Sequence, residues 1–342
     1  MPIGDRRVLS LGLVILTAAT LLVRSAAAQT VVRASLDGPI EGPSAPFFVA
    51  LDHGYFQRRG LTVRFEPAAT VLDPITRVAA GTFQMGVADL NALIRWRDQN
   101  PGAPVRAVFV VYDRVPYAVI ARRSRGIALP KDLEGKRLGA PAASASSAQW
   151  PLFAKLNNID AAKVTIEPMG IPVRDPMLAA GQIDAIAADA FRSFIDLKDR
   201  GVPVNDLVVW RMADYGLRLY GNVIIVNAKF ADANPKAVSD FLAAFLQGLK
   251  DTVKNPAAAI PSVLQRNDVA KKDVELERLR MAIRENILTP DVLAHGYGDV
   301  DPVRLQAALD QLELTAKFKT KPTPAQVFDA SFLPPIEVRK VN

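Results

Sequence analysis

The sequence predicts an α/β protein whose parallel-type sheets are flanked by helices and followed by a helical C-terminal tail. Short apolar strand patterns alternate with helical patterns between residues 30 and 226. From Asn234 onward almost every pattern is helical, and apolar residues from Val238 to Val253 form one stripe. Half of the 342 residues are apolar and 23% are charged, which suits a folded core. The length indicates about two domains.

Strands are predicted where short apolar or alternating runs are bounded by Gly, Pro or Asp. The first such run ends at the turn Asp37-Gly38-Pro39, and the second begins after Gly60. The complete series of predicted strands is 31–36, 61–65, 85–88, 105–112, 117–121, 136–140, 164–167, 185–187, 207–210 and 220–226.

Helices are predicted where apolar residues recur at helical spacing behind a capping residue. The first begins near Ser44, carries Phe47, Phe48 and Leu51 on one face, and stops at Gly60. The later helices cover 73–81, 89–96, a segment ending at 158, 174–180, the stripe after 234, 271–287 and 302–314.

Composition excludes several classes of protein. The chain has no Cys, so disulfide scaffolds, thiolate metal sites and cysteine nucleophiles are excluded. His53 is interpreted as a solvated helix position and His295 as part of a surface loop, and we expect no metal site. No glycine-rich dinucleotide motif, phosphate loop or Gly-x-Ser-x-Gly elbow occurs, so we expect no cofactor and no enzymatic activity. The formal charge of +7 is spread along the chain, so we expect no nucleic-acid partner.

Residues 1–28 are predicted to be a secretory signal peptide. Arg6 and Arg7 precede an apolar run over 9–23, and small residues end at a cleavage site after Ala28. The run is shorter than the roughly 20 residues that span a bilayer, although a retained anchor and export by the twin-arginine route remain alternatives. Without Cys there is no lipid-attachment residue, so we expect a free periplasmic protein.

Three strand-to-helix junctions carry small or polar residues: 37–44, 89–91 and 144–147. In open α/β sheets, ligands bind beyond the carboxyl ends of strands, where helix N-termini offer free N–H groups. Because Pro151 suits the first position of a helix, Trp150 is placed at a helix mouth. The alternatives are that Trp150 only packs beside a cap and that Asp89 is only an N-cap.

Six segments occur in one order: ALDHGYF (50–56), GLTV (60–63), GTFQMGVAD (81–89), LPKDLEGKR (129–137), AGQIDA (180–185) and YGNVIIVN (220–227). In order and spacing, this series resembles the periplasmic solute-binding proteins of ABC importers. The branch that it resembles is the nitrate, sulfonate and taurine group, with its relatives for thiamine-pyrimidine precursors.

The resemblance implies a two-lobed, type II-like Venus flytrap fold with two crossover strands and a ligand cleft. The crossings would fall near 112–117 and 215–222. The first lobe would then comprise residues 29–114 plus 217–342, and the second lobe 115–216.

The resemblance also implies which side chains contact the ligand. The ligand-binding candidates are Ser44, Phe47, Asp89, Asn91, Tyr112, Ser144, Ser146, Ser147, Trp150, Asp189 and Asn222. The possible anion-binding residues are Arg114, Arg174 and Arg218. Serine hydroxyls and helix N–H groups favour a negative or strongly polar headgroup, and Phe47, Tyr112 and Trp150 could stack on a planar body.

We therefore expect a monomeric, non-enzymatic binding protein that delivers a sulfonate, carboxylate or pyrimidine-like molecule to an ABC permease and its ATPase. Two alternatives remain. A periplasmic sensing module for a signalling partner would share the fold, and an enzyme like the relatives that make the thiamine pyrimidine would need a cysteine motif that is absent here.

Overall fold

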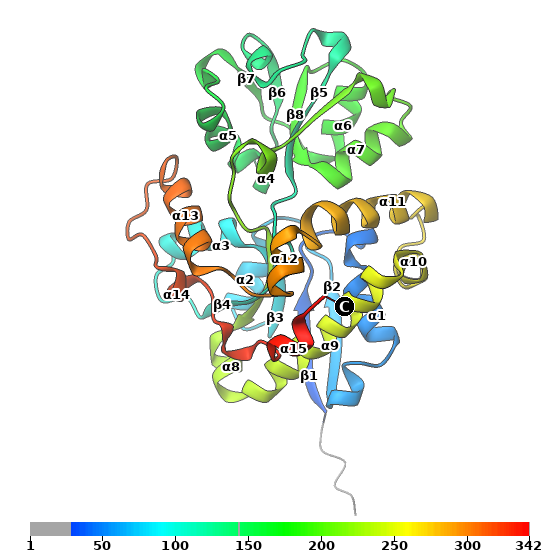
Figure 1. Ribbon diagram of the computed structural model, residues 1–342, viewed down its shortest axis with the longest axis vertical. Coiled ribbons are helices and arrows are strands. Elements are labelled where there is room, and N and C mark those ends of the chain that lie inside the picture. The colour runs from blue at the N-terminus through cyan, green and yellow to red at the C-terminus, as the bar shows by residue number, and fades with distance from the viewer. Residues whose placement is uncertain (1–28, 143, 342) are drawn as a thin grey trace, which may run out of the picture.

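The strands form two separate five-stranded sheets, each packed against helices, in a computed structural model that describes residues 29–142 and 144–341 (Figure 1). The α/β class and the two-lobed architecture are therefore confirmed. The predicted signal peptide lies outside the described residues. The strands are β1 (Thr30–Ser35), β2 (Leu61–Glu66), β3 (Met85–Asp89), β4 (Val105–Val110), β5 (Tyr117–Arg122), β6 (Arg137–Gly139), β7 (Thr165–Glu167), β8 (Ala185–Asp189), β9 (Leu207–Arg211) and β10 (Asn222–Asn227).

The two sheets repeat one topology. The first lobe has the order β2-β1-β3-β10-β4, and the second lobe has β7-β6-β8-β5-β9. In each sheet, three parallel strands are followed by one antiparallel strand that also pairs with the edge strand. The central strands β3 and β10 are buried along their whole length, which explains their continuous apolar runs.

Two connections join the lobes, at residues 111–116 and 212–221. We expected crossover strands, but both connections are irregular apart from the short helix η7 (Met212–Tyr215). They lie side by side, because the Gly221 N–H donates to the Tyr112 carbonyl over 2.9 Å. A Cβ atom at Gly221 would stand 2.9 Å from the Tyr112 Cβ, so this close approach requires glycine.

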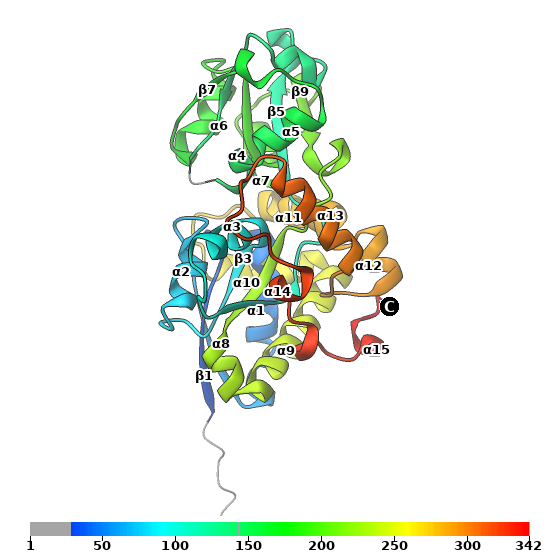
Figure 2. The same cartoon turned by 90° about the vertical axis from the view of Figure 1, so that its left-hand side faces the viewer.

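The helical tail packs on the first lobe, as Figure 2 shows in side view. The predicted stripe forms the buried face of α9, which packs against α1. The helices are α1 (Ala45–Asp52), α2 (Asp73–Ala79), α3 (Leu90–Gln99), α4 (Ala145–Ala148), α5 (Trp150–Leu156), α6 (Ile171–Ala179), α7 (Ala190–Asp199), α8 (Ala228–Ala233), α9 (Pro235–Lys254), α10 (Pro256–Leu264), α11 (Lys272–Ala282), α12 (Pro290–His295), α13 (Pro302–Glu313), α14 (Pro324–Val327) and α15 (Ile336–Arg339). Short turns of helix include η1 (Gly42–Ser44) and η8 (Ile283–Ile287).

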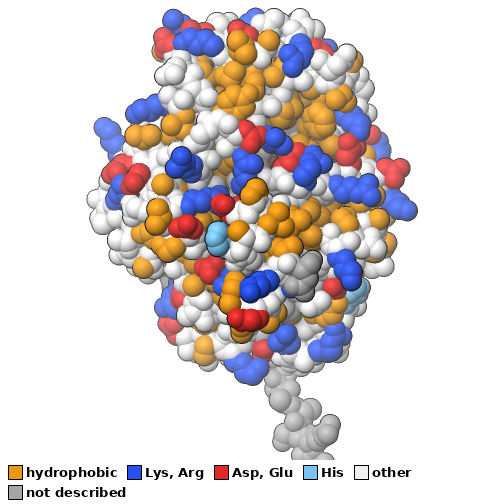
Figure 3. Space-filling view, in the orientation of Figure 1, with side chains coloured by type: hydrophobic (Ala, Val, Ile, Leu, Met, Phe, Trp, Pro, Cys, Tyr) orange, Lys and Arg blue, Asp and Glu red, His pale blue; other side chains and the backbone are white. Residues whose placement is uncertain are grey.

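Several helices of the structure are absent from the predicted series, among them α7 and α12. Helix α7 follows β8 directly, and α12 ends at His295, which we expected in a loop. On the face drawn in Figure 3, basic and acidic side chains are interspersed. Within the described ranges, no helix combines the length and apolar character needed to cross a bilayer.

Candidate functional site

A cavity of about 320 Å³ lies between the lobes, where strand ends from both sheets meet. The first lobe contributes the segments after β1 and β2, the end of β3 and the start of β10. The second lobe contributes the start of β5, the end of β8 and the first turns of α4, α6 and α7. Six predicted site residues line it: Asp89, Tyr112, Ser144, Arg174, Asp189 and Asn222.

Asp89 is both the N-cap of α3 and part of the cavity wall. Its Oδ1 accepts from the Ala92 N–H over 2.7 Å, and its Oδ2 accepts from the Tyr117 hydroxyl. Burial raises the pKa of Asp89, although the Tyr117 hydrogen bond, the Ala92 N–H and the charge of Arg95 oppose this effect. Both oxygens of the Asp89 carboxylate therefore already accept hydrogen bonds from within the protein, one from α3 and one from β5.

Asn91 lies behind this wall and not on it. Its Nδ2 donates to the Tyr117 hydroxyl over 3.1 Å and to the Tyr220 carbonyl over 2.8 Å. Burial raises the pKa of Tyr117 well above the usual range, and the neighbouring Asp89 adds to this shift. Tyr117 remains a neutral donor and acceptor that links β5 to α3.

The serine loop has one hydroxyl that lines the cavity and two that are buried. Ser144 lines the cavity and caps α4 by accepting from the Ser147 N–H over 3.4 Å. The Ser146 hydroxyl donates to the Asp189 Oδ1 over 2.6 Å, so it orients that carboxylate. The Ser147 hydroxyl is buried without a hydrogen-bond partner among the described residues.

We expect Ser146→Ala to destabilise the protein by about 1–3 kcal/mol, because Asp189 loses a short hydrogen bond. Ser147→Ala is the matched control, and it should be near neutral because the hydroxyl that it removes has no partner. Urea unfolding of both variants measures the difference. Equal destabilisation by the two variants would contradict this assignment.

Three predicted residues are part of the core or of a turn instead of the cavity wall. Phe47 stacks on Phe245 with ring centroids 4.4 Å apart, and Trp150 packs beside Phe153. Ser44 exchanges hydrogen bonds with the Glu41 backbone in η1. The expected stacking of Phe47 and Trp150 on a ligand does not fit these positions, because α1 and α5 turn these aromatic faces into the core.

The three candidate arginines offer no free guanidinium to the cavity. Arg114 pairs with Asp214 over 2.5 Å in the connections between the lobes. Arg174 lines the cavity but is buried, and it pairs with Asp175 over 2.8 Å and with the hydroxyl of Ser193 over 2.5 Å. Arg218 is exposed and does not line the cavity.

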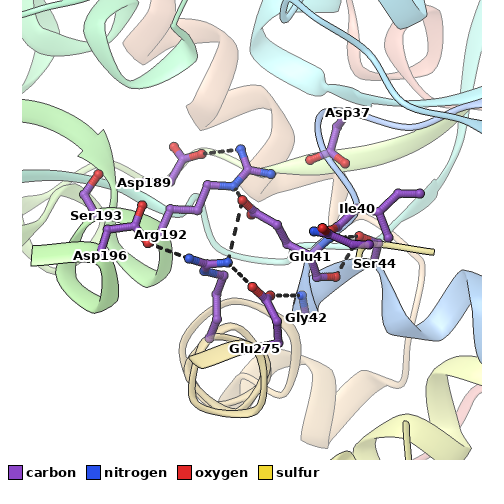
Figure 4. A network of polar contacts seen from close by, with 12 residues as sticks. Asp37, Ile40, Glu41, Gly42, Ser44, Asp189, Arg192, Ser193, Asp196 and Glu275 are labelled. Atoms are coloured by element: carbon purple, nitrogen blue, oxygen red, sulfur yellow. Dashed lines mark hydrogen bonds and ion pairs between the residues drawn. The ribbon is translucent and has the colours of Figure 1, made fainter. Parts of the chain in front are cut away.

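Arg192, which sequence reasoning missed, is the basic residue that spans the site (Figure 4). From α7 of the second lobe, its Nε donates to the Glu41 Oε2 of the first lobe over 2.7 Å. Its Nη1 lies 3.7 Å from the Asp189 Oδ2. Burial alone would lower the pKa of Arg192, but the charges of Glu41, Asp189 and Asp37 outweigh it and raise that pKa.

Asp37 is the second residue that was not singled out. It follows β1, lines the cavity, and its Oδ2 accepts from the Asn222 Nδ2 over 2.7 Å. Burial raises the pKa of Asp37; Arg192 lowers it, whereas Asp189 raises it further. Its place between Leu36 and Gly38, at the end of a buried strand, was the available signal for this residue.

Acidic groups outnumber unmatched basic groups around the cavity. Asp37, Asp89 and Asp189 line it, and Glu41 lies behind them. The described lining includes two arginines, Arg174 and Arg192. Because Arg174 already pairs with Asp175, Arg192 is the remaining cation. This excess of acceptors and negative charge suits hydrogen-bond donors or a cation better than it suits an anion.

The family profile described as NMT1/THI5-like matches residues 42–259. The riboflavin-binding protein RibY of Chloroflexus aurantiacus is 30% identical over 227 residues, which cover 65% of this chain and 62% of RibY. The chain therefore matches less than two thirds of that relative's length. The formylaminopyrimidine-binding protein of Halalkalibacterium halodurans is 23% identical over 244 residues, covering 70% of this chain and 72% of the relative.

Solved structures show the same fold. The alkanesulfonate-binding protein SsuA from Xanthomonas axonopodis pv. citri, bound to MOPS, superposes with a TM-score of 0.64 at 15% identity. The superposition covers 89% of this chain and 98% of SsuA. The resemblance carried by the six ordered segments is thereby confirmed. Because the matching profile spans well over half of the sequence, the chain belongs to the NMT1/THI5-like family.

Proposed function

We propose that this chain is an extracytoplasmic solute-binding protein that captures a small organic molecule between its lobes and delivers it to an ABC permease. The observation that carries this proposal is the interlobe cavity, whose walls come from equivalent strand ends of both sheets. Such a ligand touches both lobes only when they are closed, so its binding shifts the population toward the closed form. The names of the relatives support a binding protein and not an enzyme.

The ligand that suits the cavity is an uncharged or cationic nitrogen heterocycle that donates hydrogen bonds. Asp37 and Asp189 present carboxylate oxygens, whereas the guanidinium of Arg192 is already shared between Glu41 and Asp189. A sulfonate or carboxylate would enter next to these acids without a free cation to receive it. The relatives named for riboflavin and formylaminopyrimidine support this ligand class.

A ligand panel tests the proposal on the secreted protein. Thermal melting and calorimetric titration are run with cytosine, riboflavin, taurine and MOPS. We expect a heterocycle to raise the melting temperature, since a ligand at a hundred times its Kd stabilises by about 2.7 kcal/mol. Saturable binding of the sulfonates taurine or MOPS, with no binding of cytosine or riboflavin, would overturn the ligand class. Small-angle scattering should show compaction with the bound heterocycle, and an unchanged radius would contradict capture by closure.

A further inference from the structure

A second cavity of about 500 Å³ adjoins the interlobe cavity. The two cavities share four lining residues: Thr70, Val71, Ser144 and Ala145. The first two of these belong to the loop after β2 of the first lobe, and the other two open α4 of the second lobe. The lining of the second cavity includes residues of α3 of the first lobe and of α4 of the second lobe, so this cavity also lies where the lobes meet.

The wall of the second cavity differs in chemistry from that of the first. It is mostly carbon, with the indole of Trp96 and the side chains of Leu72 and Ala148 among its lining groups. Leu72 is 41% exposed and Trp96 is half-buried, so the fold leaves both partly uncovered at the mouth of the site. No carboxylate lines this cavity among the described residues.

The one charged side chain of this described wall is engaged within the protein. With the Gln149 amide turned so that its oxygen faces Arg95, the two Nη atoms of Arg95 lie 2.7 and 2.9 Å from that oxygen. Arg95 also offsets the charge of the neighbouring Asp89. This guanidinium is thus engaged by Gln149 of the second lobe, and the rest of the wall is mostly apolar.

We propose that the second cavity is a subsite for an aromatic or apolar body of the same ligand whose donor-bearing polar end lies in the acidic cavity. This inference rests on the proposed function. It adds that the ligand is large enough to fill both cavities and that its polar end and its apolar body occupy different ones. The shared residues come from both lobes, so closure clamps the ligand at the junction between its two parts. A large ligand with an extended ring system fills both cavities, whereas a single pyrimidine ring fills one.

Trp96→Ala tests the subsite with two probes, riboflavin for a polar chain joined to a ring system and cytosine for a polar ring alone. We expect the Kd for riboflavin to rise roughly tenfold or more, because a large aromatic contact is lost, and the Kd for cytosine to stay within twofold. Trp96→Phe should retain most of the riboflavin affinity. Phe318→Ala is the matched control, since Phe318 is a half-buried aromatic of the same core cluster outside both cavities, and it should change neither Kd.

A second variant fills the subsite from an exposed position. Ala148 is exposed on α4, so Ala148→Trp should fold and block riboflavin while cytosine still binds. If the wild type binds both probes but these variants lose the same affinity for riboflavin and for cytosine, or lose none, the subsite alone would be overturned. Failure of the wild type to bind either probe would overturn the proposed ligand class and the subsite with it.

Discussion

Replacing Asp37 with Asn is expected to stabilise the unliganded protein at neutral pH and to weaken its capture of a hydrogen-bond-donating ligand. Burial raises the pKa of Asp37 above its ordinary value, so the folded state binds this proton more tightly than the unfolded state does. Such a group stabilises the fold at low pH, and that contribution disappears as the pH rises from the unfolded pKa through the raised one. At neutral pH the wild type therefore bears a buried carboxylate that the amide avoids.

The same substitution removes the charged acceptor from the cavity. A hydrogen bond to a charged group contributes about 1.5–3 kcal/mol, so we expect the Kd for the captured heterocycle to rise roughly tenfold to a hundredfold. The amide oxygen can still accept from the Asn222 Nδ2, which leaves the local structure intact. A ligand that donates to Asp37 also favours its ionised form, so wild-type affinity should fall as the pH is lowered through the raised pKa.

Melting temperatures between pH 4 and pH 8, together with titration calorimetry, check both parts of this prediction. Asp268→Asn is the matched control, because it removes one exposed carboxylate from the loop between α10 and α11. A stability gain for Asp37→Asn that is the same at pH 4 and pH 8 would show that the buried charge is not its cause. Unchanged affinity would remove Asp37 from the ligand contacts.

The fold was readable from the sequence because its dominant signals are local. Strands such as β3 and β10 are continuous apolar runs between turn residues, and the buried face of α9 repeats at helical spacing. Helix α7 carries the same kind of signal in Phe191, Phe194 and Ile195, and following that pattern would have given both the helix and Arg192. The two connections between the lobes were expected to be strands but are irregular. Their backbones contact each other through residues far apart in the sequence, and a local pattern does not reveal such a contact.

Only part of the candidate site could be predicted from the sequence. Local patterns reveal site residues whose partners are nearby in the sequence, and they do not reveal contacts between distant residues. The capping roles of Asp89 and Ser144 depend on residues three positions away, so the junctions reveal them. The pairing of Arg192 with Glu41 joins residues 151 positions apart, and no periodicity encodes such a contact. Phe47 looked like a ligand contact because its partner Phe245 lies on the distant α9.

Replacing Arg192 with Met is expected to loosen the closure of the lobes and to weaken ligand capture with it. The substitution leaves Glu41 of the first lobe and Asp189 of the second lobe without the guanidinium that they share. Breaking a buried ion pair from one side costs about 3–5 kcal/mol, and an exposed pair contributes about 0–1 kcal/mol. Because the side chains of Arg192 and Glu41 are 25% and 17% exposed, we expect a cost between these limits, on the order of 2 kcal/mol.

Small-angle scattering should report a larger radius of gyration for unliganded Arg192→Met, and titration should report a weaker affinity. Lys198→Met is the control on the same helix, since its pair with Glu277 is exposed on both sides and should contribute little. The decisive variant is the double substitution Arg192→Met with Glu41→Gln. If the Glu41 carboxylate, left with Arg278 at 3.7 Å as its ion-pair partner, causes the loosening, neutralising it should restore much of the compaction, which a double-mutant cycle expresses as a coupling energy. Strictly additive effects of the two substitutions would show that Arg192 acts on closure through its bulk, and the ion pair would then have no part in holding the lobes together.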